Sequence, residues 1–291
     1  MLAAIALAAA AMNYRHAFHA GNFADVFKHT IWIGLIESLK RKQTPFCCID
    51  THAGSARYQL GASEAGRTLE YTGGIAAVMQ AHSLPSLLHL YLGLVRHFNP
   101  GGSLQVYPGS PLLTAALLRE SDRLIACELQ PEEAQRLKAE FRHDARVACH
   151  QRDGYEALSA LLPPKERRGA VLIDPPFEQA DEFDRAIAAL RAAHERWPQG
   201  IYAFWYPIKL RADIEVQYRK LKSLPFDRML IAELCLHPDD TALRLNGCGM
   251  LLINPPYRYD QELGQLLPLM AQLLSQSRHS RHALRVLKEP A

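Results

Sequence analysis

Short apolar runs alternate with helix-like segments along most of this chain, and this alternation constrains the fold more than any other feature. Each run holds a few apolar residues and stops at a turn former or a charged residue, as strands do. Strands are expected at residues 45–50, 123–128, 146–152, 169–174, 200–206, 229–237 and 250–254. Helices are expected at residues 22–41, 111–119, 131–141, 155–162, 180–195 and 209–222. The pattern predicts an α/β fold with a doubly wound, mostly parallel sheet.

One segment interrupts this alternation. Residues 58–103 carry helical periodicity, at Ile75–Met79 and again at Leu87–Phe98, and contain no convincing strand. We therefore predict a small helical insertion at 58–103. It would separate residues 1–57, which include the first strand, from residues 104–291, which complete the main domain.

The composition narrows the class of protein. Apolar residues make up 48% of the chain and charged residues 22%, as in an ordinary globular domain. The net charge of +3 permits a polyanionic partner without requiring one. The six cysteines form no Cys-x-x-Cys pair, so we expect free thiols in a reducing cytosol and no metal site.

The first residues are apolar but do not suit a membrane segment. Residues 1–12 are too short to span a bilayer and lack the basic start of a signal peptide. We expect a cytoplasmic protein with no membrane anchor, whose natural start is Met12.

Acidic residues follow four of the expected strands, namely Asp50, Glu128, Asp153 and Asp174. A single acid at a strand end is usually a turn former. A series of them at the carboxyl ends of parallel strands predicts a binding site, because those ends share one edge of the sheet. An acid after the second strand can bind ribose hydroxyls, and Asp153 with Gly154 can sit beside an adenine amino group. The Gly-x-Gly-x-x-Gly spacing is missing after Asp50, so we expect a cofactor without a pyrophosphate, which S-adenosylmethionine fits.

The segment Asp174-Pro175-Pro176-Phe177 carries the most specific chemistry. The carboxylate can accept hydrogen bonds from an amino group, and the prolines donate none, so nearby carbonyls are free to accept. The Phe177 ring offers a face on which a base can stack. The pattern is similar to the Asp/Asn-Pro-Pro-aromatic signature of amino-group methyltransferases that use S-adenosylmethionine. By itself it could equally be a strand that ends in a rigid turn.

A second segment, Asn254-Pro255-Pro256-Tyr257, matches the same signature at least as well. Its expected place in the fold distinguishes it from the first. Asp174 ends the fourth parallel strand, whereas Asn254 ends the last expected strand, which runs antiparallel in methyltransferase folds. Its carboxyl end would then lie at the opposite edge of the sheet. We therefore assign the chemistry to Asp174 and a structural turn to the second segment.

The segment Tyr14–His29 resembles the N-terminal motif of the bacterial ribosomal RNA large subunit methyltransferase J family. Further segments match the family pattern in the same order, namely Asp50–Gly54, Tyr107–Pro111, Asp153-Gly154 and Ile173–Pro176. The resemblance runs from about Met12 to the last expected strand. It departs at Phe177, where the family usually has tyrosine.

This resemblance implies a Rossmann-like class I methyltransferase with a helical insertion, which uses S-adenosylmethionine to methylate N6 of one adenine in 23S ribosomal RNA. Asp174 is implied as the catalytic acceptor, together with the Pro175 carbonyl and the Phe177 ring. The residues implied to contact the cofactor are His29, His52, Ser110, Glu128, Asp153, Gly154 and Asp174. Those implied to meet the substrate are Tyr14, His16 and Lys28.

Other interpretations remain open at this point. A DNA adenine methyltransferase would use the same chemistry, and a non-catalytic nucleic-acid-binding protein could use the same fold. Lys28 and His29 could instead form an exposed helix face, and His52 could be a core histidine. The joint match favours function, with a monomer acting on 23S ribosomal RNA, free or partly assembled.

Overall fold

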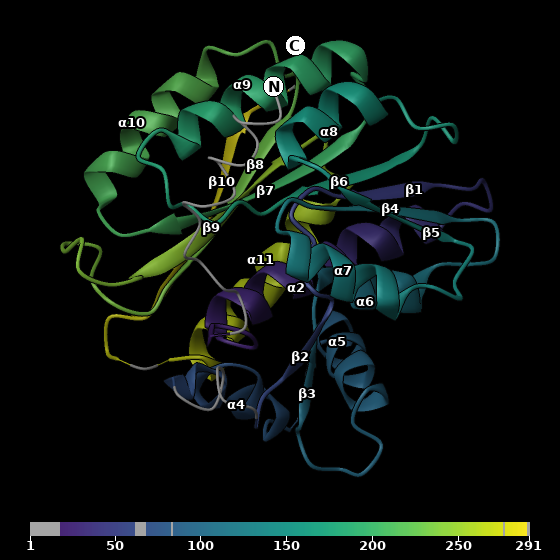
Figure 1. Cartoon of the computed structure of the whole chain (residues 1–291). Helices are drawn as coiled ribbons and strands as arrows, with labels where there is room; N and C mark the ends of the chain where they lie inside the picture. Colours follow the sequence, from purple (N-terminus) through teal and green to yellow (C-terminus); the bar gives the residue numbers. More distant parts are fainter. Residues whose placement is uncertain (1–17, 62–67, 83, 276, 290–291) are drawn as a thin grey trace.

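A computed structural model describes residues 18–61, 68–82, 84–275 and 277–289 (Figure 1). Within these ranges the chain folds around one large mixed sheet. Its strands are β1 (Cys47–Asp50), β4 (Arg123–Glu128), β5 (Val147–Gln151), β6 (Gly169–Ile173), β7 (Ile201–Ile208), β8 (Met229–Cys235), β9 (Gly247–Ile253) and β10 (Arg281–Lys288). They lie in the order β10-β8-β9-β7-β6-β1-β4-β5.

The strand order places a switch point between β1 and β6. Both strands run parallel, and the chain adds β4 and β5 on one side and β7 on the other. Their carboxyl ends therefore share one edge of the sheet, where ligands bind in folds of this kind. β9 runs antiparallel to both β7 and β8, so Asn254 lies at the opposite edge. The antiparallel direction predicted for the strand before Asn254 is confirmed.

Helices cover both faces of the sheet (Figure 1). They are α2 (Phe23–Lys40), α6 (Ser110–Leu117), α7 (Pro131–Glu140), α8 (Gly154–Leu161), α9 (Glu182–Arg196), α10 (Arg211–Lys222) and α11 (Tyr259–Leu273). In β6, Val171 and Ile173 pack into one core with α8, α9 and α10, while Ala170 and Leu172 pack into another with α2, α6 and α11. This is the two-residue period of a buried strand, and the predicted α/β fold is confirmed. Among the described residues, every helix is too short or too polar to cross a bilayer.

The segment after β1 forms a smaller layer on one side of the sheet (Figure 1). It contains β2 (Arg57–Gln59), η2 (Glu70–Gly73), α4 (Ile75–Met79), α5 (Ser86–His97) and β3 (Val106–Pro108). The two expected helical stretches are present as α4 and α5. The expectation of no strand from residue 58 was wrong, because β2 pairs antiparallel with β3. Three residues are too few to show a strand period, and the partner lies beyond residue 103.

Two elements near the end of the chain were not predicted. β10 pairs antiparallel with β8 at the sheet edge, so the expectation that the strand before Asn254 is the last one was wrong. Exposed and half-buried residues follow one another in pairs along β10, so the alternation that marks a strand is absent. α11 contains Pro268, which weakens the helical signal of its sequence.

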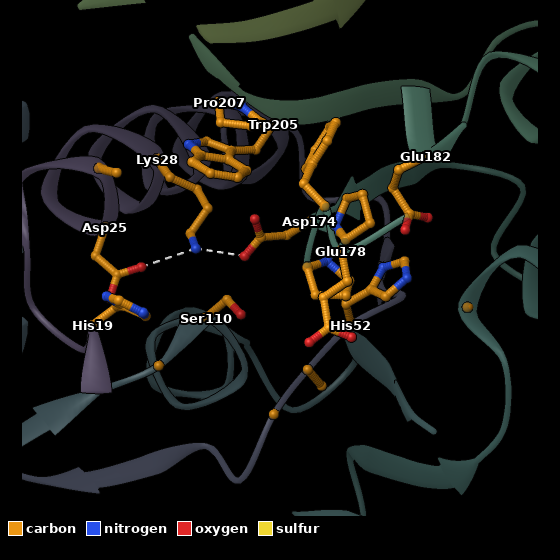
Figure 2. Close-up of a pocket in the computed structure, with 18 of the residues that line it drawn as sticks. His19, Asp25, Lys28, His52, Ser110, Asp174, Glu178, Glu182, Trp205 and Pro207 are labelled. Carbon is orange, nitrogen blue, oxygen red and sulfur yellow. Dashed lines mark hydrogen bonds and ion pairs between the residues drawn. The ribbon is translucent and has the colours of Figure 1, made fainter. Parts of the chain in front are cut away.

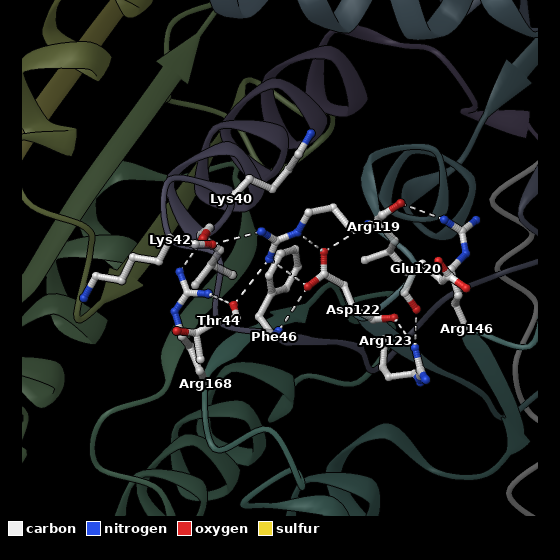
Figure 3. A network of polar contacts seen from close by, with 12 residues as sticks. Lys40, Lys42, Thr44, Phe46, Arg119, Glu120, Asp122, Arg123, Arg146 and Arg168 are labelled. Atoms are coloured by element: carbon white, nitrogen blue, oxygen red, sulfur yellow. Dashed lines mark hydrogen bonds and ion pairs between the residues drawn. The ribbon is translucent and has the colours of Figure 1, made fainter.

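A cluster of polar contacts fixes the end of α2 at the amino-terminal edge of the sheet (Figure 3). The guanidinium groups of Arg119 and Arg168 lie 5.5 and 5.9 Å from the centre of the buried Phe46 ring. Arg119 donates to the Lys42 carbonyl at 3.0 Å and Arg168 to the Thr44 carbonyl at 2.7 Å. The carbonyls that follow α2 are therefore satisfied by side chains. The contact holds α2 in one position relative to β1, which begins at residue 47.

Phe46→Ala should lower the free energy of unfolding by about 3–5 kcal/mol, because it empties a fully buried ring site under both guanidinium groups. Urea denaturation followed by circular dichroism measures the change. Tyr257→Ala is the control, since that ring is 74% exposed and its loss should cost less than about 0.5 kcal/mol. Equal losses of unfolding free energy in the two variants would contradict the role of Phe46 as a buried packing residue.

Candidate active site

A cavity of about 650 Å³ opens at the carboxyl edge of the parallel strands (Figure 2). Its size is typical of a small-molecule site. Every predicted site residue that the structure describes lines this cavity, namely Lys28, His29, His52, Ser110, Glu128, Asp153, Gly154, Asp174, Pro175 and Phe177. Tyr14 and His16 lie outside the described residues. Sequence positions almost 150 residues apart are thus brought to one place.

Lys28 is the buried centre of this site. Its ammonium donates to Oδ2 of Asp174 at 2.5 Å and lies 2.9 Å from Oδ1 of Asp25 (Figure 2). The side chains of Lys28, Asp25 and Asp174 are 4%, 2% and 14% exposed. Burial lowers the pKa of Lys28, but attraction to Asp174 and Asp25 outweighs burial and holds that pKa well above its usual range. Lys28 therefore stays charged between two carboxylates.

The exposed-face interpretation of Lys28 and His29 was wrong. Lys28 is enclosed by the two carboxylates, and His29 is 1% exposed. The His29 ring contacts Tyr107, with 2.7 Å between Nδ1 and the hydroxyl oxygen. Both residues line the cavity, so the face of α2 that carries them points into the site.

Phe177 holds an unusual backbone conformation at the turn after β6. Its φ is +51°, a left-handed value that costs a residue with a side chain about 1–3 kcal/mol. The ring stacks on Phe204 at 6.1 Å between centroids and meets the Trp205 ring edge-on at 6.0 Å. These packing contacts hold the strained turn, and the ring remains part of the cavity wall.

The acids at the other strand ends shape the far side of the cavity. Glu128 accepts from the Gly54 amide at 2.9 Å and from the Gln130 amide at 2.7 Å. Asp153 caps α8 by accepting from the Tyr155 amide at 2.8 Å. Glu128 receives one of these bonds at each oxygen, and two amides of α8 donate to Oδ1 of Asp153, so each acid keeps lone pairs with which to accept from a ligand.

Glycine is required at residue 54. Its φ is +61°, and an added Cβ would lie 2.1 Å from the hydroxyl oxygen of Tyr58. A side chain in the turn that brings the Gly54 amide onto Glu128 would therefore be strained and would displace Tyr58.

Two ionisable groups near the cavity have shifted pKa values. Burial lowers the pKa of His52 to about 4, so its imidazole is neutral at pH 7. Its Nδ1 lies 2.8 Å from the Thr51 hydroxyl. Burial raises the pKa of Asp50 to about 7, because the carboxyl group is fully enclosed at the end of β1.

The family model described as "Ribosomal RNA large subunit methyltransferase D, RlmJ" matches residues 43–286. The chain belongs to this family. Ribosomal RNA large subunit methyltransferase J from Escherichia coli (strain K12) is 44% identical over 88% of this chain and 92% of that protein. The protein of the same name from Haemophilus influenzae is 38% identical over 90% of this chain and 94% of that protein. The crystal structure of protein LPL1258 from Legionella pneumophila superposes with a TM-score of 0.85 at 33% identity, covering 92% of this chain and 98% of that one.

Family membership confirms the predicted methyltransferase fold and its cofactor, S-adenosylmethionine. The cofactor supplies an electrophilic methyl group on a sulfonium. The cavity fits it, because carboxylates at the strand ends suit its hydroxyl groups and its positive charges. His52, which is neutral, places no competing charge there.

Sequence reasoning missed further residues that line the cavity, among them Asp25, Trp205 and Pro207. Asp25 looked like an ordinary acid in the first turn of a helix, yet it holds Lys28 and accepts from the Gly21 amide at 2.9 Å. Trp205 lies with its ring centre 5.7 Å from the Lys28 ammonium, and Pro207 lies beside it (Figure 2). The available signal was the strand period, since Trp205 and Pro207 share one face of β7.

Lys28→Met should lower the free energy of unfolding by about 3–5 kcal/mol, because it leaves two buried carboxylates facing each other. Urea denaturation measures the change, and adding Asp25→Asn should restore part of it. Lys40→Met is the matched control on the same helix, since the Glu37–Lys40 pair has the same spacing but lies at the surface. That change should cost less than about 1 kcal/mol. A Lys28→Met protein as stable as Lys40→Met would contradict the buried pair.

Asp50→Asn should flatten the pH dependence of stability between about pH 4 and pH 7. The unfolded chain loses this proton near the ordinary pKa of 3.8, whereas the folded chain keeps it to about 7. The folded state therefore binds more protons in this window, and its stability falls as pH rises, by up to about 1.4 kcal/mol per pH unit. Denaturation at several pH values checks this, with the exposed Asp181→Asn as control. If stability changed with pH in the same way in the wild type and in Asp50→Asn, the raised pKa of Asp50 would be refuted.

Proposed function

We propose that this chain transfers a methyl group from S-adenosylmethionine to N6 of one adenine in 23S ribosomal RNA. The observation that carries the proposal is the Asp174-Pro175 pair in the wall of a cavity beside the Phe177 ring. Both curated relatives are named ribosomal RNA large subunit methyltransferase J, which supports ribosomal RNA as the substrate.

Asp174 would act as the acceptor for the adenine amino group. Its Oδ2 is held by Lys28, and no described residue donates to Oδ1. Hydrogen bonds from the amino group to Oδ1 and to the Pro175 carbonyl would draw its nitrogen toward tetrahedral geometry. Its lone pair, otherwise delocalised into the ring, would then be available for attack, and alignment would supply much of the rate gain.

Lys28 would position and polarise Asp174 rather than touch the reacting nitrogen. Its ammonium holds Oδ2 of Asp174 at 2.5 Å, which fixes the direction of the carboxylate and leaves Oδ1 to accept from the substrate. A strong base is unnecessary, since the amine becomes acidic only once methylated. The proton would then leave to Asp174 or to water.

The target base would stack against aromatic side chains. Phe177 lies next to Trp205, and both rings line the cavity. Stacking on such a ring contributes about 1–3 kcal/mol per base. Phenylalanine in place of the family's usual tyrosine preserves the stacking face.

The cofactor would lie along the acidic strand ends. We assign its contacts to His29, His52, Ser110, Glu128, Asp153, Gly154 and Asp174. Glu128 would accept from ribose hydroxyls, and Asp153 would lie near the adenine amino group of the cofactor. Tyr14 and His16 keep their predicted roles at the substrate. We further propose that the protein acts as a cytoplasmic monomer on 23S ribosomal RNA, free or partly assembled.

Asp174→Ala should reduce methyl transfer at least about 100-fold, because it removes the oxygen that accepts the hydrogen bond from the adenine amino group. The assay is transfer of labelled methyl groups from the cofactor to 23S ribosomal RNA from a strain that lacks the gene, followed by mapping of the modified base.

Asn254→Ala provides the matched control at the second proline pair. Asn254 donates to the carbonyls of Pro198 and Gly200 at 2.7 and 2.9 Å, so alanine should cost about 1–3 kcal/mol of stability. Methylation by the folded variant should persist. Loss of methylation in Asn254→Ala with retention in Asp174→Ala would overturn the assignment of the chemistry to Asp174. Labelling of DNA but not RNA would favour a DNA methyltransferase.

A further inference from the structure

The loop between β8 and β9 presents an aliphatic side chain to water, two positions before a residue that lines the cavity. Leu243 is 95% exposed, more than any other large apolar side chain among the described residues. Leu245, two positions later, lines the cavity together with Lys209 and Pro207. Two residues span at most about 7 Å of chain, so the Leu243 backbone lies within that distance of the Leu245 backbone.

The loop is held in place by hydrogen bonds from a buried asparagine. Asn246 is fully buried, and its amide donates to the carbonyls of Lys209 and Thr241, each at 2.7 Å. The Leu243 amide donates to the Thr241 hydroxyl at 3.3 Å. The conformation that displays Leu243 is thus largely fixed before any partner binds, which reduces the entropy lost on binding.

An ion pair anchors the other end of the loop. Arg211 donates to Asp239 at 2.7 Å, and Asp239 also pairs with Arg281 of β10. A backbone bridge joins Leu210 to Asp240. The loop is therefore tied to the residues that follow β7, the strand that carries Trp205.

Asp174 lies deep in the cavity, and this depth gives an exposed apolar side chain near the cavity a possible use. That carboxylate is 14% exposed, so an adenine can reach it only after leaving the base stack. Unstacking costs a few kcal/mol and leaves a gap in the RNA. Apolar side chains that enter a stack between neighbouring bases are a known way to offset this cost.

We propose that Leu243 is a wedge that enters the RNA stack next to the target adenine and favours its extrusion into the cavity. The proposal rests on the proposed function above. Two exposed cationic side chains lie close by, since Arg244 directly follows Leu243 and Lys209 lines the cavity with Leu245, and both suit RNA phosphates. Asp240 is the exposed acid nearest in sequence, on the far side of Leu243 from the residue that lines the cavity.

The test compares two RNA hairpins cut from 23S ribosomal RNA around the mapped adenine. In the first the adenine is base-paired within a stem, and in the second it lies opposite an abasic site, where extrusion costs less. Leu243→Ala should lower kcat/KM on the paired hairpin about tenfold more than on the second hairpin. Leu243→Phe should recover most of the loss, since a ring also fills the gap.

Controls separate the wedge from other causes. Tyr257→Ala, exposed at the opposite edge of the sheet, should not change the ratio between the two hairpins. Leu243→Ala should melt like the wild type, since its side chain lies in water. Equal losses on both hairpins, or no loss on the paired one, would overturn the wedge. Absence of methylation of either hairpin by the wild type would instead refute the proposed function.

Discussion

The ion pair between Lys28 and Asp174, completed by Asp25, is the contact on which the arrangement of the site depends. It joins α2 to the end of β6 across 146 positions of sequence. A buried ammonium needs its compensating carboxylates, so α2 cannot slide along the sheet without exposing an uncompensated charge. The opposite end of α2 is held by Arg119 and Arg168 over Phe46. With both ends fixed, the helix presents one face to the cavity.

The two proline pairs show how direction in a sheet decides chemistry. Both follow buried apolar strands, and their amino-acid sequences are closely similar. β6 runs parallel to β1 and delivers Asp174 to the switch point, beside Lys28. β9 runs antiparallel, and the Asn254 amide is occupied by two backbone carbonyls that close a turn. A carboxylate in one place and an amide in the other suit these different surroundings.

The site is preorganised, and in the proposed function it is the nucleic acid that would change shape on binding. Phe177 is kept in a left-handed conformation by the aromatic rings of its neighbours, and Leu243 is displayed by a loop with a buried asparagine. In both cases the free-energy cost of the conformation is already part of the folded state before any substrate binds. An extruded base would then meet groups that need little rearrangement.

Local sequence patterns gave most of the elements. The helix expected at 22–41 and the strands expected at 123–128 and 169–174 agree with α2, β4 and β6 to within one residue at each end. The prediction of strands failed where the apolar pattern was short, as in β2. It also failed where exposed residues broke the apolar–polar alternation, as in β10. Both strands exist because a distant partner completes their hydrogen bonds.

The sequence by itself determined the fold class, the acid-ended strands and the motif around Asp174, because periodicity and turn chemistry are properties of neighbouring residues. It could not determine that Lys28 is buried, that Asp25 forms an ion pair with it, or that Trp205 lies beside it. These facts depend on how α2 and β7 meet the edge of the sheet. Burial of a charge is decided by residues far away in the chain, and only the tertiary structure brings them together.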